Sequence, residues 1–533
     1  MKKLKFLTVL IALIFSVAAF TFTACESNSG GVVGNGNNSG NTDNENTDDW
    51  NNDDENTGNG NTGGDKEPQG VEIFGLAEEI ANINIVTADG QDITGDEDNQ
   101  EYKTAKFTVT NGRDGENFES VPGKVRVRGN NTAGYDKKSF RLKFDSKINL
   151  FGLNNGAKCK NWVLLASYKD VSFLRDAVTF EFAKQSLAEN GYYSSDYCFA
   201  EVSINGKYNG LYLVAEQQQV NPNRVDVYEP VEGYTGTDIG YLVEYDGNAY
   251  KEPVGVKFSV SYSSFPLVCE DGKQMVASQY PFVRDVMYTV KNDMYGPNPN
   301  NTEQLRFITE YTKNVFKILY DAIYNGKYTT FNSDYTAIVP ADFTDARSAV
   351  EAVVNLDSWV DMFILQEIAC DNDIDWSSFF FSVDMSAGGD KKLTFQAPWD
   401  FDSGFGMMKG LEELDKIFTA NSYTNAMHGL NPWTALPAHA DWFMKVVAER
   451  WNELKERGVF TRLTYLIETV TETYKPYFEK NYTRWDNLGK IVDPVQSETL
   501  KDFKSQSDAS DYLKNWLSRR INFLDKYFKD LLK

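Results

Sequence analysis

The chain has 533 residues, of which 41% are hydrophobic and 14% are aromatic. This length predicts about two to four domains or lobes, and the composition excludes a chain that is disordered throughout. The net charge of −24 disfavours nucleic acid as a partner, because an acidic surface repels phosphate backbones.

Residues 1–25 have the features of a bacterial lipoprotein signal peptide. Three lysines precede an apolar run from Phe6 to Phe20, and small residues lead to Cys25. Phe22 stands where this signal usually has Leu, so cleavage at an ordinary secretory site nearby is the alternative. We expect lipidation of Cys25, which would attach an exported protein to the cell envelope, at the cell surface or in the periplasm.

Residues 26–70 form a low-complexity stretch that is rich in Asn, Gly and acidic residues. Such a stretch cannot bury enough apolar area to offset the entropy of its chain. It is predicted to be a flexible, disordered tether between the anchor and a folded body. No later segment is apolar over a long enough span to cross a membrane, so the lipid anchor is the only membrane attachment that we expect.

A β-rich first lobe is predicted over residues 71–250, because the hydrophobic pattern there mostly has a period of two residues. The pair Asn205-Gly206 between two of these segments is a strong hairpin signal. One helix is predicted at Ser172–Glu189, where apolar residues share a face. The predicted strands are Asn82–Thr87, Lys103–Thr110, Lys124–Arg128, Ser139–Phe144, Trp162–Ala166, Ala200–Ile204, Leu211–Glu216 and Tyr241–Tyr245.

A helical second lobe is predicted over residues 251–533, since the hydrophobic period becomes helical after about residue 300. A short strand pair, Phe379–Val383 and Leu393–Ala397, interrupts the helices. A β-rich half followed by a helical half indicates an α+β protein with two lobes. The predicted helices are Gln304–Tyr324, Ala346–Val354, Leu356–Cys370, Trp442–Arg457, Leu463–Asn481 and Ala509–Leu532.

Two acidic clusters in the second half carry the clearest functional signal. Asp371, Asp373 and Asp375 directly follow a predicted helix, and Asp400 and Asp402 directly follow a predicted strand. The strand pair between them returns the chain to its starting point, so we expect both clusters to face one cleft. Carboxylates on such loops suit Mg²⁺ or Mn²⁺, and they also suit orienting a hydroxyl nucleophile for phosphoryl transfer.

The sequence offers few histidines and cysteines for other kinds of catalytic or metal site. His428 and His439 are its only histidines, so a hydrolase triad with a His base is not expected. No CxxC pair occurs, which disfavours a structural zinc site. Four cysteines remain if Cys25 is lipidated, and they either pair in an oxidising compartment or are plain buried thiols: Cys159, Cys198, Cys269 and Cys370.

Seven segments of the chain keep the order of one family's motifs. They are Val125–Thr132, Lys137–Phe144, Asn161–Asp170 with Ser172–Asp176, Ile204–Gln217, Gly240–Glu244, Asn372–Ser378 and Pro398–Gly406. Together they resemble the spore-coat-protein-H (CotH) family over about residues 120–410, and the helical tail to about residue 530 fits too. This resemblance implies an atypical, two-lobed protein-kinase fold and the ability to phosphorylate secreted proteins.

The resemblance also implies roles for individual carboxylates. Asp373 looks like the catalytic Asp, and Asp402, with Asp400 as the near alternative, looks like the metal-binding Asp. Ser378 stands where protein kinases carry an Asn for a second metal ion. A hydroxyl is a weak ligand, so either one metal ion is lost or Asp375 supplies the missing ligand.

The first lobe would then hold ATP. Arg141 and Lys143 alternate on one strand face and are the main candidates for phosphate contacts, with Arg128 as a weaker one. Glu181 on the predicted helix, or Glu216 on a strand, would pair with such a cation. The competing interpretation is that Arg141 and Lys143 form a solvated strand face.

A calcium loop is the competing interpretation of the first acidic cluster. The spacing of Asp371, Asp373 and Asp375 matches the start of such a loop. However, Trp376 stands where the loop needs Gly, and the Glu at its twelfth position is missing. A site for calcium alone is therefore disfavoured.

Two classes of function fit these observations. The first is an exported protein kinase that uses ATP and a divalent metal ion to phosphorylate hydroxyl side chains of secreted or surface proteins. The second is a non-catalytic surface module, a pseudokinase that serves adhesion or binds wall polymers and glycans. The high aromatic content and the tether suit the second class. The scarcity of ATP outside the cytoplasm also disfavours an exported kinase.

Overall fold

The computed structural model describes residues 79–112, 117–268, 274–275, 286–420 and 431–533. All of them belong to one unit, Pro68–Lys533. The predicted signal peptide with Cys25, the predicted tether at 26–70, Cys269 and His428 lie outside the described residues. In the described ranges, no helix combines the length and the hydropathy that a membrane span requires.

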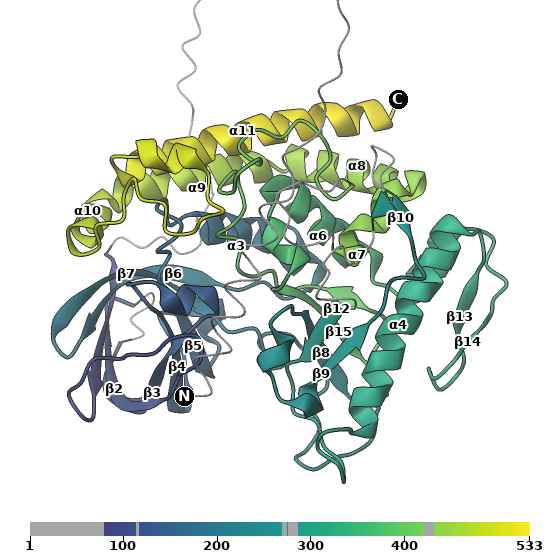
Figure 1. Cartoon of the computed structure of the whole chain (residues 1–533), viewed down its shortest axis with the longest axis horizontal. Coiled ribbons are helices and arrows are strands. Elements are labelled where there is room, and N and C mark those ends of the chain that lie inside the picture. Colours follow the sequence, from purple (N-terminus) through teal and green to yellow (C-terminus); the bar gives the residue numbers. More distant parts are fainter. Residues whose placement is uncertain (1–78, 113–116, 269–273, 276–285, 421–430) are drawn as a thin grey trace, which may run out of the picture. The chain divides into compact units, whose positions relative to one another are not determined.

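Seven strands form a closed barrel in the order β1-β2-β3-β4-β5-β7-β6 (Figure 1). Neighbouring strands are antiparallel, except that β1 and β6 close the barrel in parallel. Buried residues alternate along β1 and β2, as expected where one strand face lines a barrel. The strands are β1 (Ala81–Thr87), β2 (Lys103–Thr110), β3 (Phe118–Arg128), β4 (Ser139–Ile148), β5 (Cys159–Leu165), β6 (Tyr197–Ile204) and β7 (Lys207–Glu216).

The barrel wall at β5 and β7 is buried on both faces. Trp162 and Leu164 of β5 pack into the barrel core, whereas Val163 and Leu165 pack into the second core, which the helices share. Leu213 of β7 also belongs to the second core. Both faces of this wall therefore need apolar side chains, which explains why these strands read as continuous apolar runs.

A second sheet has five strands in the order β16-β15-β8-β12-β9. Strand β8 lies at its centre and pairs antiparallel with β12 and β15. The first lobe predicted from the sequence extends to residue 250 and includes β8, but the barrel ends at Glu216 and β8 belongs to the second sheet. The strands are β8 (Gly240–Tyr245), β9 (Lys257–Val260), β12 (Val286–Val290), β15 (Phe379–Asp384) and β16 (Thr394–Phe395).

Two small two-stranded sheets complete the strands of the described residues. They are β10 (Leu267–Val268) with β11 (Gln274–Met275), and β13 (Thr329–Phe331) with β14 (Ile338–Pro340). The second of them packs on helix α4 (Glu303–Tyr324) through Phe331, whose ring stacks on Tyr311 at 5.0 Å between centroids.

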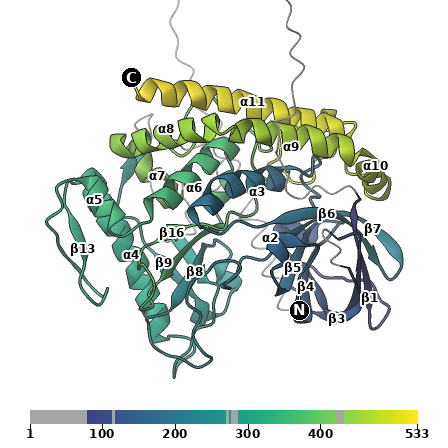
Figure 2. The same cartoon turned by 180° about the vertical axis from the view of Figure 1, so that it is seen from behind.

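Several of the longer helices gather on one side of both sheets, with α3 and α6 beneath α8, α9 and α11, whereas α4 runs along the outer edge of the second sheet (Figure 2). Helix α6 is buried along almost its whole length, as a helix with apolar residues all round should be. Because α6 is buried in the second core, it holds the start of the acidic loop at residues 371–375 in place. The helices are α2 (Leu153–Gly156), α3 (Arg175–Gln185), α4 (Glu303–Tyr324), α5 (Ala346–Glu351), α6 (Leu356–Ala369), α7 (Pro432–Ala435), α8 (Asp441–Glu456), α9 (Val459–Thr473), α10 (Lys475–Arg484) and α11 (Gln506–Leu531).

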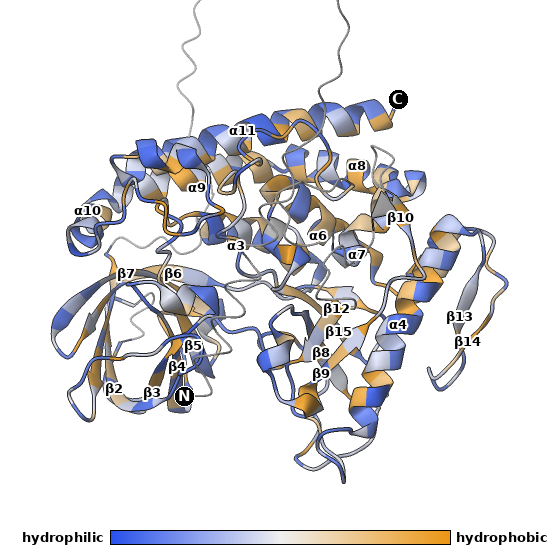
Figure 3. Cartoon of the chain, in the orientation of Figure 1, coloured by the Kyte–Doolittle hydropathy of each residue, from blue (hydrophilic) through white to orange (hydrophobic). Residues whose placement is uncertain are grey.

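The long outer helices are amphipathic and have side-chain caps. Helices α4 and α11 each carry hydrophilic and hydrophobic stripes (Figure 3). The Thr302 side chain accepts a hydrogen bond from the N–H of Leu305 at the start of α4. Ser505 and Asp508 form a reciprocal capping box at the start of α11.

Two predicted helices differ from the structure for local reasons. The predicted helix Leu463–Asn481 is divided at Tyr474, because Pro476 in the first turn of α10 has no N–H to continue the ladder of α9. The predicted helix Ser172–Glu189 begins only at Arg175 and passes into a 3₁₀ turn, η3 (Leu187–Asn190). The mixture of helices and strands confirms the α+β class.

Candidate active site

A cavity of about 760 Å³ opens between the barrel and the second sheet. The barrel contributes Arg126, Arg128 and Arg141 to its lining, from β3 and β4. Both acidic loops that follow α6 and β16 reach the same cavity, with Asp373 on one loop and Asp402 on the other. The cavity is therefore lined by three arginines of the barrel, here called the arginine wall, and by carboxylates of the two acidic loops.

Asp373 reaches the cavity because the chain turns sharply after α6. Cys370 ends the helix in the left-handed region with φ 48°, a conformation that is uncommon for a residue other than glycine. The Oδ1 atom of Asp371 then accepts the N–H of Asp373 at 2.9 Å and starts the 3₁₀ turn η6 (Asn372–Asp375). Burial raises the pKa of Asp373, and the nearby Lys169 ammonium opposes this.

Asp371 lies behind Asp373 and is fully buried. Its Oδ2 atom has no hydrogen-bond partner among the described residues. Burial raises the pKa of its carboxyl well above the ordinary value, and the charge of Asp373 adds to that effect. Asp371 therefore positions Asp373 through the backbone rather than facing the cavity itself.

Asp400 and Asp402 both line the cavity after β16. The backbone is again unusual here, with φ 61° at Ala397 and φ 66° at Asp400. Such backbone strain is frequent at functional sites. Burial, together with the charges of Asp402 and Asp373, raises the pKa of Asp400 to about 6. Ser378 Oγ lies 3.4 Å from Asp400 Oδ2.

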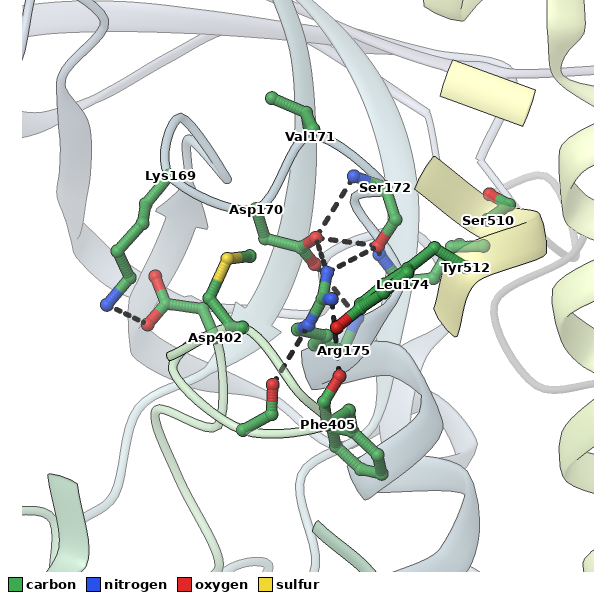
Figure 4. A network of polar contacts seen from close by, with 12 residues as sticks. Lys169, Asp170, Val171, Ser172, Leu174, Arg175, Asp402, Phe405, Ser510 and Tyr512 are labelled. Atoms are coloured by element: carbon green, nitrogen blue, oxygen red, sulfur yellow. Dashed lines mark hydrogen bonds and ion pairs between the residues drawn. The ribbon is translucent and has the colours of Figure 1, made fainter. Parts of the chain in front are cut away.

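Lys169 lines the same cavity, and the sequence interpretation did not include it among the site residues. Its Nζ lies 2.8 Å from Asp402 Oδ1 (Figure 4). The same ammonium donates to Ser403 Oγ at 2.6 Å. Burial acts against its charge, but the carboxylates of Asp402 and Asp373 outweigh burial and raise the pKa of Lys169 well above the ordinary value. Lys169 lies within a motif quoted for the family resemblance, but its position in the sequence gives no sign of this ion pair.

The first turn of α3 holds the loop that carries Asp402. Arg175 Nε donates to the carbonyl of Gly404 at 3.0 Å, and Nη2 donates to the carbonyl of Phe405 at 3.4 Å (Figure 4). Asp176 accepts the N–H of Phe401 at 2.9 Å from the other side. The guanidinium of Arg175 is itself fixed by an ion pair with Asp170. The loop is therefore tied to α3 at both ends.

The arginine wall follows from strand register. Arg126 and Arg141 are directly opposite each other across β3 and β4, and Arg128 is two residues along from Arg126 on the same face. Arg141 Nε is buried with no hydrogen-bond partner in the described part of the chain. Burial and the neighbouring arginines lower the pKa of Arg141. The period-two pattern of Val125-Arg-Val-Arg contained the signal for Arg126, which the sequence interpretation did not use.

Other predicted site residues lie elsewhere. Lys143 is exposed and is not among the residues that line the cavity. Glu216 is fully buried in an ion pair with Arg224 at 3.1 Å. Glu181 of α3 pairs with Arg462 at 3.4 Å. Neither glutamate contacts the arginine wall in these pairs.

Asp375 also has a structural partner. Its Oδ1 atom accepts the N–H of Asn431 at 3.0 Å, at the start of α7. Burial raises the pKa of its carboxyl well above the ordinary value. The residue is not among those that line the cavity. Its geometry thus links two segments of the second lobe.

The cavity has a second ionic group on the side of the sheet. Lys291 pairs with Glu244 and lies 3.7 Å from Asp246. Burial raises the pKa of Glu244 to about 7, although Lys291 opposes this. Thr289 donates to Asp246 at 2.8 Å. The sequence interpretation did not find this group, because it predicted no element between residues 251 and 300.

The residues fit a metal ion only in one mode. Within the described ranges, no three carboxylate, imidazole or thiolate side chains converge closely enough to hold a metal ion alone. Mg²⁺ usually needs only one or two carboxylates, with waters and substrate phosphates as its other ligands. Asp400 and Asp402 suit this mode, since the mutual repulsion that raises the pKa of Asp400 would be relieved by a cation.

Comparison with known families agrees with this geometry. The sequence model described as CotH kinase protein matches residues 125–524. The chain belongs to the CotH kinase protein family. The matched region includes the arginines of β3 and β4 that line the cavity and both acidic loops. It begins within β3 and ends within α11, so β1 and β2 precede it. A search of curated proteins found no match.

Proposed function

We propose that this CotH family member is an atypical protein kinase that transfers the γ-phosphoryl group of ATP to hydroxyl side chains of exported proteins. The observation that carries the proposal is the convergence of Asp373 and Asp402, from two separate loops, on a cavity that arginines of the barrel also line. We also propose that the barrel corresponds to the first lobe of a kinase, and that the second sheet with the helices corresponds to the second lobe.

The carboxylates and arginines that line the cavity suggest separate roles in the reaction. Asp373 would accept the proton of the acceptor hydroxyl, whose oxygen forms the new bond to phosphorus while the bond from the γ-phosphorus to the bridging oxygen breaks and ADP leaves. Asp402 and Asp400 would hold Mg²⁺ or Mn²⁺, which offsets negative charge on the phosphates. The guanidinium groups of Arg128 and Arg141 would donate pairs of hydrogen bonds to phosphate oxygens, and the charge of Arg126 would add to their attraction for the phosphates.

Ser378 favours a site with a single metal ion. It stands at the position where protein kinases carry the Asn that holds a second one. Its hydroxyl contacts Asp400, and its N–H donates to Glu244 Oε1 at 3.2 Å. Ser378 would thus orient Asp400 instead of acting as a ligand.

The location of the reaction rests on the N-terminal sequence. Residues 1–25 predict export and lipidation at Cys25, so the acceptor would be a secreted or surface protein, and the only contact with the membrane would be the lipid. The acidic net charge of −24 continues to disfavour nucleic acid as a partner.

The test is incorporation of labelled phosphate by the purified full chain with ATP and Mn²⁺ or Mg²⁺. We expect label in the wild type, none above background in Asp373→Ala and Asp402→Ala, and normal incorporation in Asp511→Ala, which changes an exposed residue of α11. Equal incorporation by Asp373→Ala would refute the proposal. Nucleotide binding without any label in the wild type would instead support the non-catalytic surface module.

A further inference from the structure

Lys169 brings a positive charge into the carboxylate cluster, and the proposed reaction assigns no role to it. Its side chain is only 6% exposed and that of its partner Asp402 only 13%. Buried charges are costly unless they are paired and hydrogen-bonded. Lys169 satisfies both conditions through Asp402 and Ser403, so its ammonium is a fixed part of the carboxylate cluster.

We propose that Lys169 is a resident counter-cation that prevents a free divalent metal ion from binding Asp402, so that the site accepts the metal ion only together with a nucleotide. The inference rests on the proposed function and deepens it, because it gives the rule by which the site selects a metal–nucleotide complex. Lys169 is in this sense a positioning and selectivity residue.

The charges around Asp402 support this rule. A divalent ion at Asp402 would stand close to the Lys169 ammonium, and like charges repel strongly where water is largely excluded. The described residues offer no set of three ligating side chains that would compensate for this repulsion. Nucleotide phosphates supply both the missing oxygen ligands and the negative charge that an ammonium attracts.

The position of the loop around Asp402 forces a metal ion to compete with the Lys169 ammonium. Arg175 and Asp176 hold the backbone of Phe401, Gly404 and Phe405 by hydrogen bonds of 2.9 to 3.4 Å. Asp402 is therefore kept beside Lys169, and a metal ion has to displace the ammonium from Oδ1 or bind without that oxygen.

The test is titration of the full chain with Mn²⁺ alone, in the absence of nucleotide, by isothermal calorimetry. We expect Lys169→Met to bind Mn²⁺ at least tenfold more tightly than the wild type. Lys169→Arg keeps the charge and should bind as weakly as the wild type. Lys445→Met makes the same substitution at an exposed position of α8 and should not change the affinity.

Three outcomes would overturn the inference. They are equal Mn²⁺ affinity in the wild type and in Lys169→Met, tight binding by Lys169→Arg, and failure of a natively folded Lys169→Met to bind Mn²⁺. If circular dichroism shows that Lys169→Met is misfolded, the wild type decides alone: tight nucleotide-free binding of Mn²⁺ contradicts the inference, and binding that needs a non-hydrolysable ATP analogue supports it. The Mn²⁺ titration involves no phosphoryl transfer, so its result is independent of the labelling assay.

Discussion

Substitution of Arg175 by Met tests whether α3 holds the metal-site loop. Arg175 is 1% exposed, pairs with Asp170, and donates to the carbonyls of Gly404 and Phe405. Met has a similar length but no charge and no donor. The substitution therefore leaves a buried carboxylate without its guanidinium and two carbonyls without their donor.

The expected loss of stability follows from these partners. Removal of one member of a buried ion pair costs about 3–5 kcal/mol. Asp170 keeps hydrogen bonds from the N–H groups of Ser172 and Arg175, because these come from the backbone. We therefore expect a loss of about 3 kcal/mol, at the lower end of that range.

The assay is urea unfolding of the full chain, followed by tryptophan fluorescence and analysed by linear extrapolation. Arg519→Met is the matched control, since Arg519 pairs with Glu413 at the surface, where both side chains are more than half exposed. Its loss should be below about 1 kcal/mol. An Arg175→Met protein that is no less stable than this control would refute the inference that Arg175 holds the loop carrying Asp402.

Three further predictions concern packing, pH and ligand binding. Gly406→Ala places a Cβ 2.4 Å from Trp516 at φ 74° and should lower the melting temperature more than Gly191→Ala, where φ is 83° and the space is open; equal shifts would contradict the packing argument. Burial raises the pKa of Glu244 from its ordinary 4.5 to about 7, so the contribution of Glu244 to folding stability should be greatest below about pH 4.5 and be lost as the pH rises through 7; the difference in urea-unfolding free energy between the wild type and Glu244→Gln should therefore change over this range, and a constant difference would contradict the assignment. Mn²⁺ with ATP should raise the melting temperature of the wild type but not of Asp402→Ala, and a similar rise in both would exclude Asp402 as a ligand.

The sequence predicted a strand at each of the seven barrel strands, because one-sided burial produces a clear period of two in most of them. Strands β9 and β12 were not found, although β12 pairs with β8 in the middle of the second sheet. They are short, with 4 and 5 residues, and too few alternations fall within them to establish a period. The predicted lobe boundary near residue 250 could not reveal that β8 pairs with strands that follow it in the chain, because pairing is a long-range property.

The site was predicted in part. The strand pair between the acidic clusters did indicate that Asp373 and Asp402 share a cavity. The roles of Lys169 and Arg175 depend on contacts with residues more than 220 positions away, which no local pattern encodes. Likewise, nothing in the spacing of the first cluster separates Asp373, at the cavity, from Asp375, whose carboxylate accepts the N–H of Asn431.

The two-sided burial of β5 and β7 limits how this protein can be divided. A fragment that stops at Glu216 would contain every barrel strand and α3, but it would lack the second sheet and the other long helices that share the second core with Val163, Leu165 and Leu213, which would leave an apolar strip of that core uncovered. Such an apolar strip on an isolated fragment favours aggregation. Exchange of barrels between family members would accordingly have to preserve the packing of this wall against the second core.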